Sequence, residues 1–321
     1  MVKHNEKNAR IKRRYAQYLA EAKRQAEASV DKALAAIDRF EQANRRRDFM
    51  AFHVEQAIAF KTRLAEELNS TTGKPLSKGT VTATLKALRR FFLWLADQPG
   101  YRSKLRYTDA DYFNASNRDQ RIARDAEQRP SPSLEQVHYV LERMPSTTDI
   151  EKRDRAIIAL LILTGVRDGA AVGLKLRHVG LADCSIRQDA RHIATKFSKT
   201  MTTWFFPVGG QAEAIFAEYV RFLREEKLWS PDDPLFPKTK IGTGPEGGFT
   251  AVGFDRAHWS SAAAIRKIVK SAFEAQGMPS YGPHSFRKTL ARLGQVVCTT
   301  PEEMKAWSQN LGHEDVMTTF R

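Results

Sequence analysis

The sequence has only two cysteines, and their positions indicate no covalent or metal-based framework. Among the 321 residues, Cys184 and Cys298 stand far apart, and neither belongs to a CxxC pair or has a second cysteine nearby. Disulfide scaffolds and zinc modules instead place several cysteines at short spacings. We therefore expect a protein without disulfides or a zinc site that folds in a reducing, intracellular compartment.

Long apolar runs are also missing. The longest run, Ala156–Leu163, is well short of the ~20 residues that a helix needs to cross a bilayer. The N-terminal stretch MVKHNEKNARIKRRYAQYL is basic but lacks the apolar centre of a signal peptide. We therefore predict a cytoplasmic protein that is neither exported by a signal peptide nor embedded in a membrane.

Acidic residues are outnumbered by basic ones. The sequence has 52 Lys and Arg against 37 Asp and Glu, which gives a formal net charge of +15 and a pI near 9.9. Such an excess is typical of proteins that bind a polyanion. Nucleic acid is the first candidate partner, and an anionic membrane surface is the second.

Turn-forming and polar stretches divide the chain into four segments. Residues 1–28 are predicted to form a charged helical arm with too few apolar residues for a buried face; a solvated arm and an arm that contacts DNA or a partner both remain open. Residues 29–116 have a helical, amphipathic pattern. Residues 117–132 are polar and end in Pro-Ser-Pro, which predicts a linker. The second domain then covers residues 133–321.

One helix of the first domain combines an apolar stripe with basic residues. Its apolar residues recur at the helical spacing, at Val81, Leu85, Leu88, Phe92 and Leu95. The basic residues lie mostly off this stripe. Such a helix suits the major groove of DNA, although solubility alone would also explain a basic face. We predict that four residues here bind DNA: Lys78, Lys86, Arg89 and Arg90.

The second domain combines helices with short strands. Helices are expected through LEQVHYVLERM and DRAIIALLIL, and again from Gln211 and from Ser260. Between them, CSIRQD, RHIATKF and TTWFFPV alternate β-branched and aromatic residues, which indicates a small antiparallel sheet. We expect PKTKIGTGPEGG to be a long polar loop. The predicted fold class is therefore mainly α with a small antiparallel β-sheet, an α+β arrangement.

Two stretches of this domain place an arginine near the start of a helix. In LTGVRDG, Arg167 follows a helix that ends at Gly165, where backbone N–H groups favour an anion and a guanidinium can hold a phosphate with two hydrogen bonds. In YGPHSFRK, His284 and Arg287 project from one face of a helix. The alternatives are an arginine that pairs with an acid and a capping histidine beside a surface arginine.

Two further stretches add a histidine and lysines. In NLGHEDVMTTFR, Gly312 fits a helix C-terminus, and His313 is expected to open a new helix or to cap one. In TKFSKTMTTWFFPV, Lys196 and Lys199 lie at the tip of an expected β-hairpin, from which a lysine can reach a bound strand. Most hairpin lysines only keep a sheet edge soluble.

Together these stretches supply two arginines, two histidines and a lysine, without a cluster of carboxylates. The nearby acids Asp168, Glu314 and Asp315 form no recognisable Mg²⁺ ligand set. We therefore predict a site that neutralises a phosphodiester with side chains, without a metal or another cofactor.

These residues resemble the tyrosine recombinase (phage integrase) family, which surrounds one scissile phosphate with an Arg in a TGxR turn, a hairpin Lys, an HxxR pair and a His in an LGHxxxxTT segment. The matching catalytic residues, in the family's order, are Arg167, Lys199, His284, Arg287 and His313. The match covers most of residues 133–321, and residues 29–116 resemble the family's helical core-binding (SAM-like) domain.

The resemblance implies a recombinase that cuts and rejoins DNA through a 3′-phosphotyrosine, for integration or excision of a mobile element. The arginines would hold the non-bridging oxygens, Lys199 would protonate the leaving 5′-oxygen, and the histidines would position the phosphate. Lys196 is the second candidate for the general acid, and it is also predicted to contact DNA. The implied partner is double-stranded DNA at a specific attachment site, bound by a tetramer of a chain that is monomeric without DNA. The implied location is the bacterial nucleoid, with a phage or other mobile element as the source.

Two positions depart from the family pattern. The family has an acid three residues after the first arginine, where this chain has Ala170. The family's nucleophilic Tyr stands nine or ten residues after the LGH histidine, which corresponds to position 322 or 323, just beyond Arg321. We expect the gene to continue with that Tyr and the 321-residue chain to be truncated before it, so that it binds DNA without cutting. Tyr281 is expected to pack rather than to act.

Other classes remain as alternatives. A type IB topoisomerase or a telomere resolvase shares this chemistry, although the two-domain layout favours a recombinase. A non-catalytic DNA-binding regulator with an integrase fold gains from Ala170 and from the missing Tyr. A metal-dependent nuclease is the weakest alternative, because it lacks a ligand set.

Overall fold

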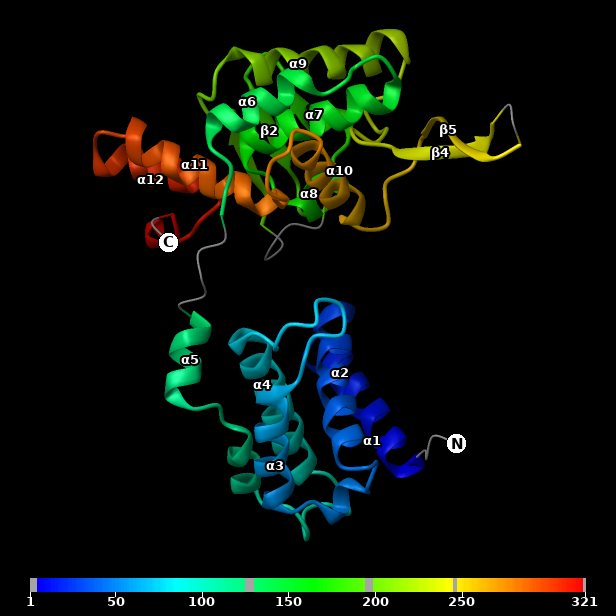
Figure 1. Ribbon diagram of the computed structural model, residues 1–321, viewed down its shortest axis with the longest axis vertical. Coiled ribbons are helices and arrows are strands. Elements are labelled where there is room, and N and C mark those ends of the chain that lie inside the picture. Colours follow the sequence, from blue (N-terminus) through cyan, green and yellow to red (C-terminus); the bar gives the residue numbers. More distant parts are fainter. Residues whose placement is uncertain (1–4, 125–129, 194–198, 245–246, 320–321) are drawn as a thin grey trace. The chain divides into compact units, whose positions relative to one another are not determined.

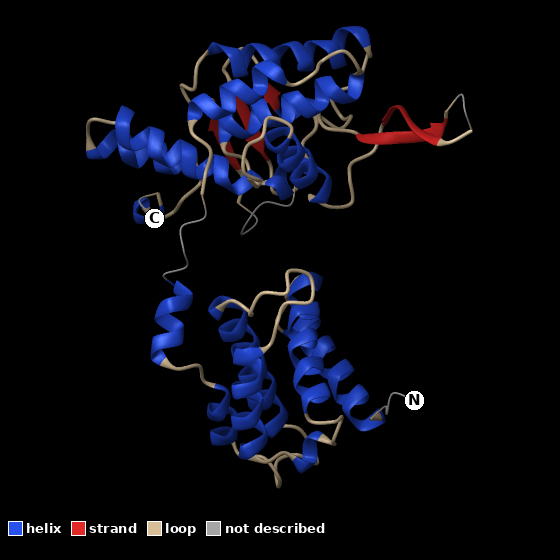
Figure 2. Ribbon diagram, in the orientation of Figure 1, coloured by secondary structure: helices blue, strands red, loops and turns tan. Residues whose placement is uncertain are grey.

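The structure, a computed structural model, describes the chain outside residues 1–4, 125–129, 194–198, 245–246 and 320–321 (Figure 1). It forms two compact units, a helical unit of residues 1–128 and a C-terminal unit of residues 129–321. Helices predominate in both units, and the strands form small antiparallel sheets (Figure 2). The fold class expected from the sequence is confirmed.

The helical unit surrounds an aromatic core. Its helices are α1 (Glu6–Gln17), α2 (Glu27–Ala43), α3 (Val54–Glu66), α4 (Lys78–Ala96) and α5 (Asn117–Arg124). Ser77 caps α4 by accepting a hydrogen bond from the Thr80 backbone N–H. The predicted apolar stripe of α4 is confirmed, since all five of its residues are buried. In the core the Phe92 ring lies 4.5 Å from the Phe52 ring and 4.8 Å from the Phe113 ring.

The prediction that residues 1–28 lack a buried face was wrong. Ile11, Tyr15 and Leu19 are spaced four apart, so the helical period gathers them on one side, and all three are buried. Asn8 is also buried, and its amide donates to Glu41 Oε1 at 2.9 Å and to the Arg47 carbonyl at 2.8 Å. Helix α1 therefore belongs to the core of the helical unit.

The polar stretch predicted as a linker begins as a helix. Helix α5 (Asn117–Arg124) has no buried side chain. It is attached through an ion pair in which Lys78 Nζ lies 2.8 Å from Asp119 Oδ1. Its polar composition reflects a solvent-facing helix, and the boundaries proposed for the linker stay a prediction.

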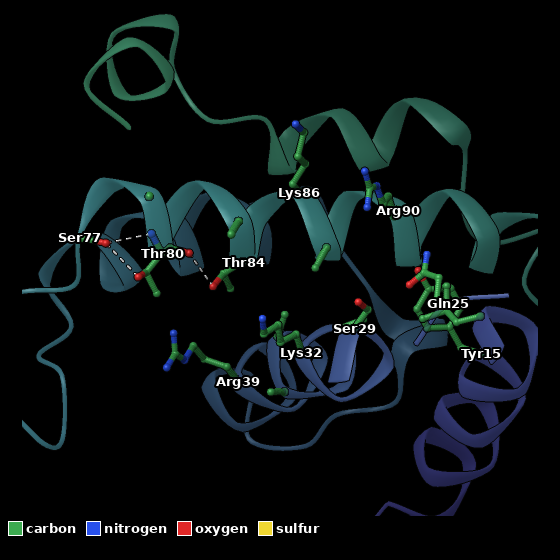
Figure 3. Close-up of a pocket in the computed structure, with 17 residues that line it drawn as sticks. Tyr15, Gln25, Ser29, Lys32, Arg39, Ser77, Thr80, Thr84, Lys86 and Arg90 are labelled. Carbon is green, nitrogen blue, oxygen red and sulfur yellow. Dashed lines mark hydrogen bonds between the residues drawn. The ribbon is translucent and has the colours of Figure 1, made fainter. Parts of the chain in front are cut away.

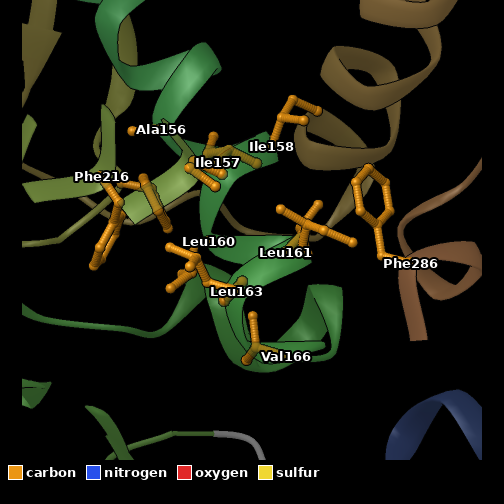
Figure 4. Close-up of a cluster of buried hydrophobic side chains, with 14 of the residues drawn as sticks. Ala156, Ile157, Ile158, Leu160, Leu161, Leu163, Val166, Phe216 and Phe286 are labelled. Carbon is orange, nitrogen blue, oxygen red and sulfur yellow. The ribbon is translucent and has the colours of Figure 1, made fainter. Parts of the chain in front are cut away.

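The C-terminal unit packs around the apolar helix α7. Its helices are α6 (Leu134–Arg143), α7 (Asp149–Thr164), α8 (Asp168–Val172), α9 (Gly210–Arg221), α10 (Ala263–Glu274), α11 (Pro283–Val297) and α12 (Pro301–Asn310). Figure 4 shows Ile157, Leu160 and Leu161 of α7 among side chains such as Phe216 of α9 and Phe286 of α11. Because α7 is held on all sides by this core, its C-terminus gives a fixed position to the turn at Gly165 that leads to Arg167.

The first sheet has three antiparallel strands in the order β1–β2–β3. They are β1 (Val179–Gly180), β2 (Ser185–Gln188) and β3 (Met201–Trp204), with Ile186 opposite Thr203. Strands in CSIRQD and TTWFFPV were predicted, whereas β1 was not. The described part of the predicted strand RHIATKF, residues 191–193, forms a turn in which the His192 and Ile193 N–H groups donate to the Asp189 carbonyl.

The prediction of a loop at residues 237–248 was wrong. Strands β4 (Lys238–Thr243) and β5 (Phe249–Asp255) form an antiparallel hairpin that extends away from the helices of its unit (Figures 1 and 2). Five glycines in and around this hairpin, such as Gly242 and Gly253, hide the β pattern in the sequence. Phe249 near its tip is 92% exposed, so the hairpin contributes little to the core.

Candidate active site

Arg167 is placed by the tight turn that ends α7. Gly165 has φ +59°, and a Cβ added there would lie 2.9 Å from Leu311 Cδ2 and 3.0 Å from Leu290 Cδ1. Both the backbone conformation and the close neighbours therefore require glycine. Arg167 then precedes α8, as predicted, but α8 has only five residues, so the guanidinium itself is the main attraction for an anion.

Within the described residues, the Arg167 side chain has no hydrogen bond or ion pair. Partial burial lowers its pKa. The adjacent carboxylate of Asp168 does not pair with Arg167, because its Oδ2 accepts from Arg266 Nε at 2.6 Å. Ala170, which stands where the resemblance expects an acid, is buried. The guanidinium of Arg167 is therefore available to a ligand.

Arg287 connects the segments that carry the other candidate residues. Its side chain is buried in α11 and donates from Nη1 to the Gly165 carbonyl at 2.6 Å and from Nη2 to the Leu311 carbonyl at 2.5 Å. Nη2 also lies 2.7 Å from His313 Nε2. Arg287 Nε is buried and has no hydrogen-bond partner among the described residues. Burial and the charge of Arg167 lower the pKa of Arg287 to about 9.

His284 lies in the first turn of α11, as the sequence predicted, one turn before Arg287. Its ring is accessible to solvent. Desolvation, followed by the charges of Arg287 and Arg167, lowers the pKa of His284. His284 is therefore neutral near pH 7, and its ring adds a polar group to a neighbourhood dominated by cations.

His313 is held in the loop after α12 by contacts on both ring nitrogens. Gly312, with φ +72°, ends the helical segment as predicted. Nε2 of His313 meets Arg287, and Nδ1 lies 2.8 Å from Thr319 Oγ1. The prediction that His313 opens a helix was wrong, because the next turn is a 3₁₀ segment capped by Asp315, whose Oδ1 accepts from Met317 N at 2.9 Å.

Lys199 lies before β3 and faces the His313 loop. Its Nζ is 3.8 Å from Glu314 Oε1, and its side chain is about half exposed, so this ion pair is weak. Strand β3 is attached to α12 through Asn310, whose Oδ1 accepts from Trp204 N at 2.8 Å and whose Nδ2 donates to Trp204 O at 2.9 Å.

Two positions on which the sequence analysis relied lie outside the described residues. One is Lys196, the second candidate for the general acid. The other is Arg321, the residue after which the nucleophilic tyrosine is expected. The role given to Lys196 and the position given to the tyrosine beyond Arg321 therefore stay predictions.

The structure thus brings Arg167, Arg287, His284 and His313 together, and Lys199 pairs with Glu314, the residue after His313. The sequence analysis missed the residues that support this group, namely Asn310, Thr319 and Ser308, whose Oγ accepts from Thr319 Oγ1 at 2.8 Å. Asn310 and Thr319 belong to the NLGHEDVMTTFR stretch, but only the folded structure shows what they contact.

The four predicted DNA-binding residues of α4 separate into two pairs. A groove of about 850 Å³ between α2 and α4 is lined by Lys86 and Arg90 (Figure 3). Lys32 and Arg39, seven residues apart on α2, line it from the other side, and the sequence analysis missed both. Arg89 instead donates to Asp111 at 2.8 Å, and Lys78 pairs with Asp119. The charges of Lys86 and Arg90 are therefore more available to DNA than those of Arg89 and Lys78.

Other kinds of site have little support in the described part of the chain. No group of three or more His, Cys, Asp or Glu side chains there has an arrangement that could hold a metal ion. No helix among the same residues has both the length and the apolar composition to cross a membrane.

Relatives of the chain come from one group of enzymes. No family model matches the sequence. Tyrosine recombinase XerD of Proteus mirabilis is 29% identical over 181 residues, which are 56% of this chain and 49% of that protein. XerC of Vibrio cholerae is 24% identical over 200 residues, 62% of this chain and 56% of XerC. The chain thus spans about half the length of the curated relatives that it matches.

Solved structures support the fold. The Tn1549 transposon integrase in complex with transposon right-end DNA has a TM-score of 0.62 at 15% identity, over 97% of this chain and 93% of that one. At this identity the likeness shows the fold alone. The curated relatives are thus tyrosine recombinases, and the Tn1549 integrase shares the fold of this chain.

Proposed function

We propose that the protein is a site-specific recombinase that cuts and rejoins DNA strands, and that the C-terminal unit holds the scissile phosphate. The observation that supports this most is the Arg167–Arg287 pair. Two guanidiniums lie close enough for one to lower the pKa of the other, and neither has a carboxylate partner among the described residues. A phosphodiester would supply the missing negative charge.

The chemistry follows from the positions of these groups. Arg167 and Arg287 would hold the non-bridging oxygens as charge builds on them, and the loss of either donor would cost roughly 10²- to 10³-fold in rate. Lys199 would give a proton to the 5′-oxygen as its bond to phosphorus breaks, a contribution of roughly 10²- to 10⁴-fold. His284 and His313 would position the phosphate and assist proton transfer.

The nucleophile is proposed to be a tyrosine at position 322 or 323, from the motif spacing. The tyrosines of the C-terminal unit have other roles. Tyr219 is buried and donates to the Leu235 carbonyl at 3.0 Å, Tyr281 packs against the Phe273 ring, and Tyr139 lies under the Arg143 guanidinium. Attack by the tyrosine oxygen would form the 3′-phosphotyrosine and release a 5′-hydroxyl, so that neither ATP nor a metal is needed.

The proposed partner is double-stranded DNA. The Tn1549 integrase structure contains transposon-end DNA, and a XerH recombinase with a TM-score of 0.62 and 16% identity, over 97% of this chain and 79% of that one, is bound to its difH substrate. The basic groove between α2 and α4 supports a DNA contact by the helical unit as well. We further propose tetramer formation on DNA and a role in moving a mobile element.

A cleavage assay tests the proposal with matched proteins. Labelled duplexes that tile the DNA flanking the gene are incubated with residues 1–321, with the chain extended through the next codons, and with the extended chain in which that tyrosine is phenylalanine. All three are expected to shift the same duplex, and only the extended chain with tyrosine should form a covalent adduct. An adduct from residues 1–321, or a reading frame without tyrosine there, would contradict the nucleophile assignment.

A non-catalytic DNA-binding regulator is the second candidate. It is favoured by Ala170 and by the pairing of Asp168 with Arg266, which leave Arg167 without the acid that the family places beside it. This candidate predicts that the extended chain shifts DNA but forms no adduct on any flanking duplex.

A further inference from the structure

We infer that Thr319, supported by Ser308, is a positioning residue that sets the tautomer of His313 and directs Nε2 of its ring toward Arg287. The inference rests on the proposed function only for the identity of the ligand as a DNA phosphate. The tautomer itself is a property of the protein without DNA, and it can be measured separately.

The contact with Arg287 fixes which ring nitrogen of His313 is the acceptor. A guanidinium has only donors, so the 2.7 Å contact between Arg287 Nη2 and His313 Nε2 requires a lone pair on Nε2. Because a neutral imidazole carries one proton, that proton must then be on Nδ1. The arrangement excludes the opposite neutral tautomer, which would set two donors against each other.

Thr319 completes this arrangement from the other side of the ring. Its Oγ1 lies 2.8 Å from His313 Nδ1 and can accept the Nδ1 proton. The same hydroxyl then directs its own hydrogen to Ser308 Oγ, also at 2.8 Å. The hydrogen bonds therefore run in one direction, from Arg287 through His313 and Thr319 to Ser308.

Burial makes this direction specific. Thr319 is 3% exposed and Ser308 is 1% exposed, so water does not substitute readily for either hydroxyl. The backbone adds a second restraint, because the His313 N–H donates to the Ser308 carbonyl at 3.0 Å. A buried hydroxyl that accepts from one nitrogen and is itself satisfied by a neighbour is the arrangement by which outer residues orient functional histidines.

The consequence for the site is that Nε2, and not Nδ1, is the nitrogen beside the buried guanidinium. In this tautomer Nε2 is an acceptor and does not donate to a ligand oxygen, so His313 would act on the ligand by holding Nη2 of Arg287 in place. Without Thr319 the ring could rotate or exchange tautomers, and the same histidine would present a donor that opposes Arg287.

The test is ¹⁵N NMR of the histidine rings in residues 1–321 at a pH where the rings are neutral, with the His313 signals assigned by their loss in His313→Gln. The expected wild-type result is the Nδ1–H tautomer. Thr319→Val should give a mixture or the Nε2–H form, and Thr319→Ser should restore the wild-type pattern. Thr84→Val, which removes a buried hydroxyl from the helical unit, is the matched control and should change nothing at His313.

Several outcomes would overturn the inference. These are an Nε2–H tautomer in the wild type, and a folded Thr319→Val variant whose His313 signals are unchanged. If Thr319→Val does not fold, Ser308→Ala replaces it, and an unchanged tautomer equilibrium in that variant also counts against the inference. DNA binding is measured in parallel, so that a tautomer set by Thr319 in a protein that binds no DNA would support the inference and reject the proposed function.

Discussion

Replacing Gly165 with alanine tests how the turn after α7 holds both arginines. The glycine has φ +59°, which costs an ordinary residue roughly 1–2 kcal/mol. The new Cβ would also meet Leu311 Cδ2 at 2.9 Å and Leu290 Cδ1 at 3.0 Å, and such overpacking costs roughly 1–3 kcal/mol. The lower entropy of the unfolded alanine chain returns about 0.4–1 kcal/mol. We expect a net loss of about 1–4.6 kcal/mol in the free energy of unfolding.

Gly277→Ala is the matched control for this variant. Gly277 lies in the same unit with φ +68°, but an added Cβ there would meet nothing within 4 Å. Its substitution should therefore show the backbone cost without the overpacking, a loss of about 0–1.6 kcal/mol. Urea denaturation of both variants gives the comparison. A Gly165→Ala variant that is no less stable than Gly277→Ala would refute the packing argument.

The same substitution has a functional consequence. The added Cβ would come within 3.4 Å of Arg287 Cγ, and the Gly165 carbonyl accepts from Arg287 Nη1. We therefore expect Gly165→Ala to lower cleavage by the tyrosine-extended protein by at least as much as the loss of one donor, roughly 10²-fold. Gly277→Ala should leave cleavage unchanged at temperatures where both variants are folded.

Three further predictions concern separate parts of the molecule. Lys86→Ala is expected to weaken DNA binding and to reduce the slope of log K against log salt by about one, as for the loss of a phosphate contact, whereas Arg89→Ala should change neither, because Arg89 is paired with Asp111. Asn310→Ala should detach β3 from α12, displace Lys199, which precedes β3, and slow cleavage. A substrate with a bridging 5′-sulfur needs no general acid, so it should recover most of the rate if the defect lies at Lys199. Arg167→Gln should abolish the stabilisation of the fold against heat that added phosphodiester gives the wild type. Equal salt slopes for the two α4 variants, no recovery with the sulfur substrate, or unchanged stabilisation would contradict the respective expectations.

The sequence predicted those features that depend on local periodicity or on a single conformational requirement. The α4 stripe from Val81 to Leu95 follows from the helical period, and Gly312 follows from the backbone that ends a helix. The same period applies to α1 and the π-helical turn after it, where Ile11, Tyr15 and Leu19 are spread among charged residues and form a stripe only at every fourth position.

Features that depend on tertiary contacts could not be predicted in this way. Nothing local indicates that Asn310 bonds to both polar backbone groups of Trp204, or that Asp168 turns to Arg266 instead of Arg167. The β4–β5 hairpin was missed because glycines weaken the strand pattern on which the sequence analysis relied.

The energetics of Arg287 suggest why so few acids surround the site. Burial and Arg167 lower the pKa of Arg287, so in the folded protein its charge is disfavoured in the absence of a ligand. The Gly165 and Leu311 carbonyls compensate in part, since they accept hydrogen bonds without carrying a full negative charge. A carboxylate in their place would neutralise the guanidinium and compete with a phosphate. Because the carbonyls orient the arginine without cancelling its charge, the site keeps its attraction for an anion that arrives from solution.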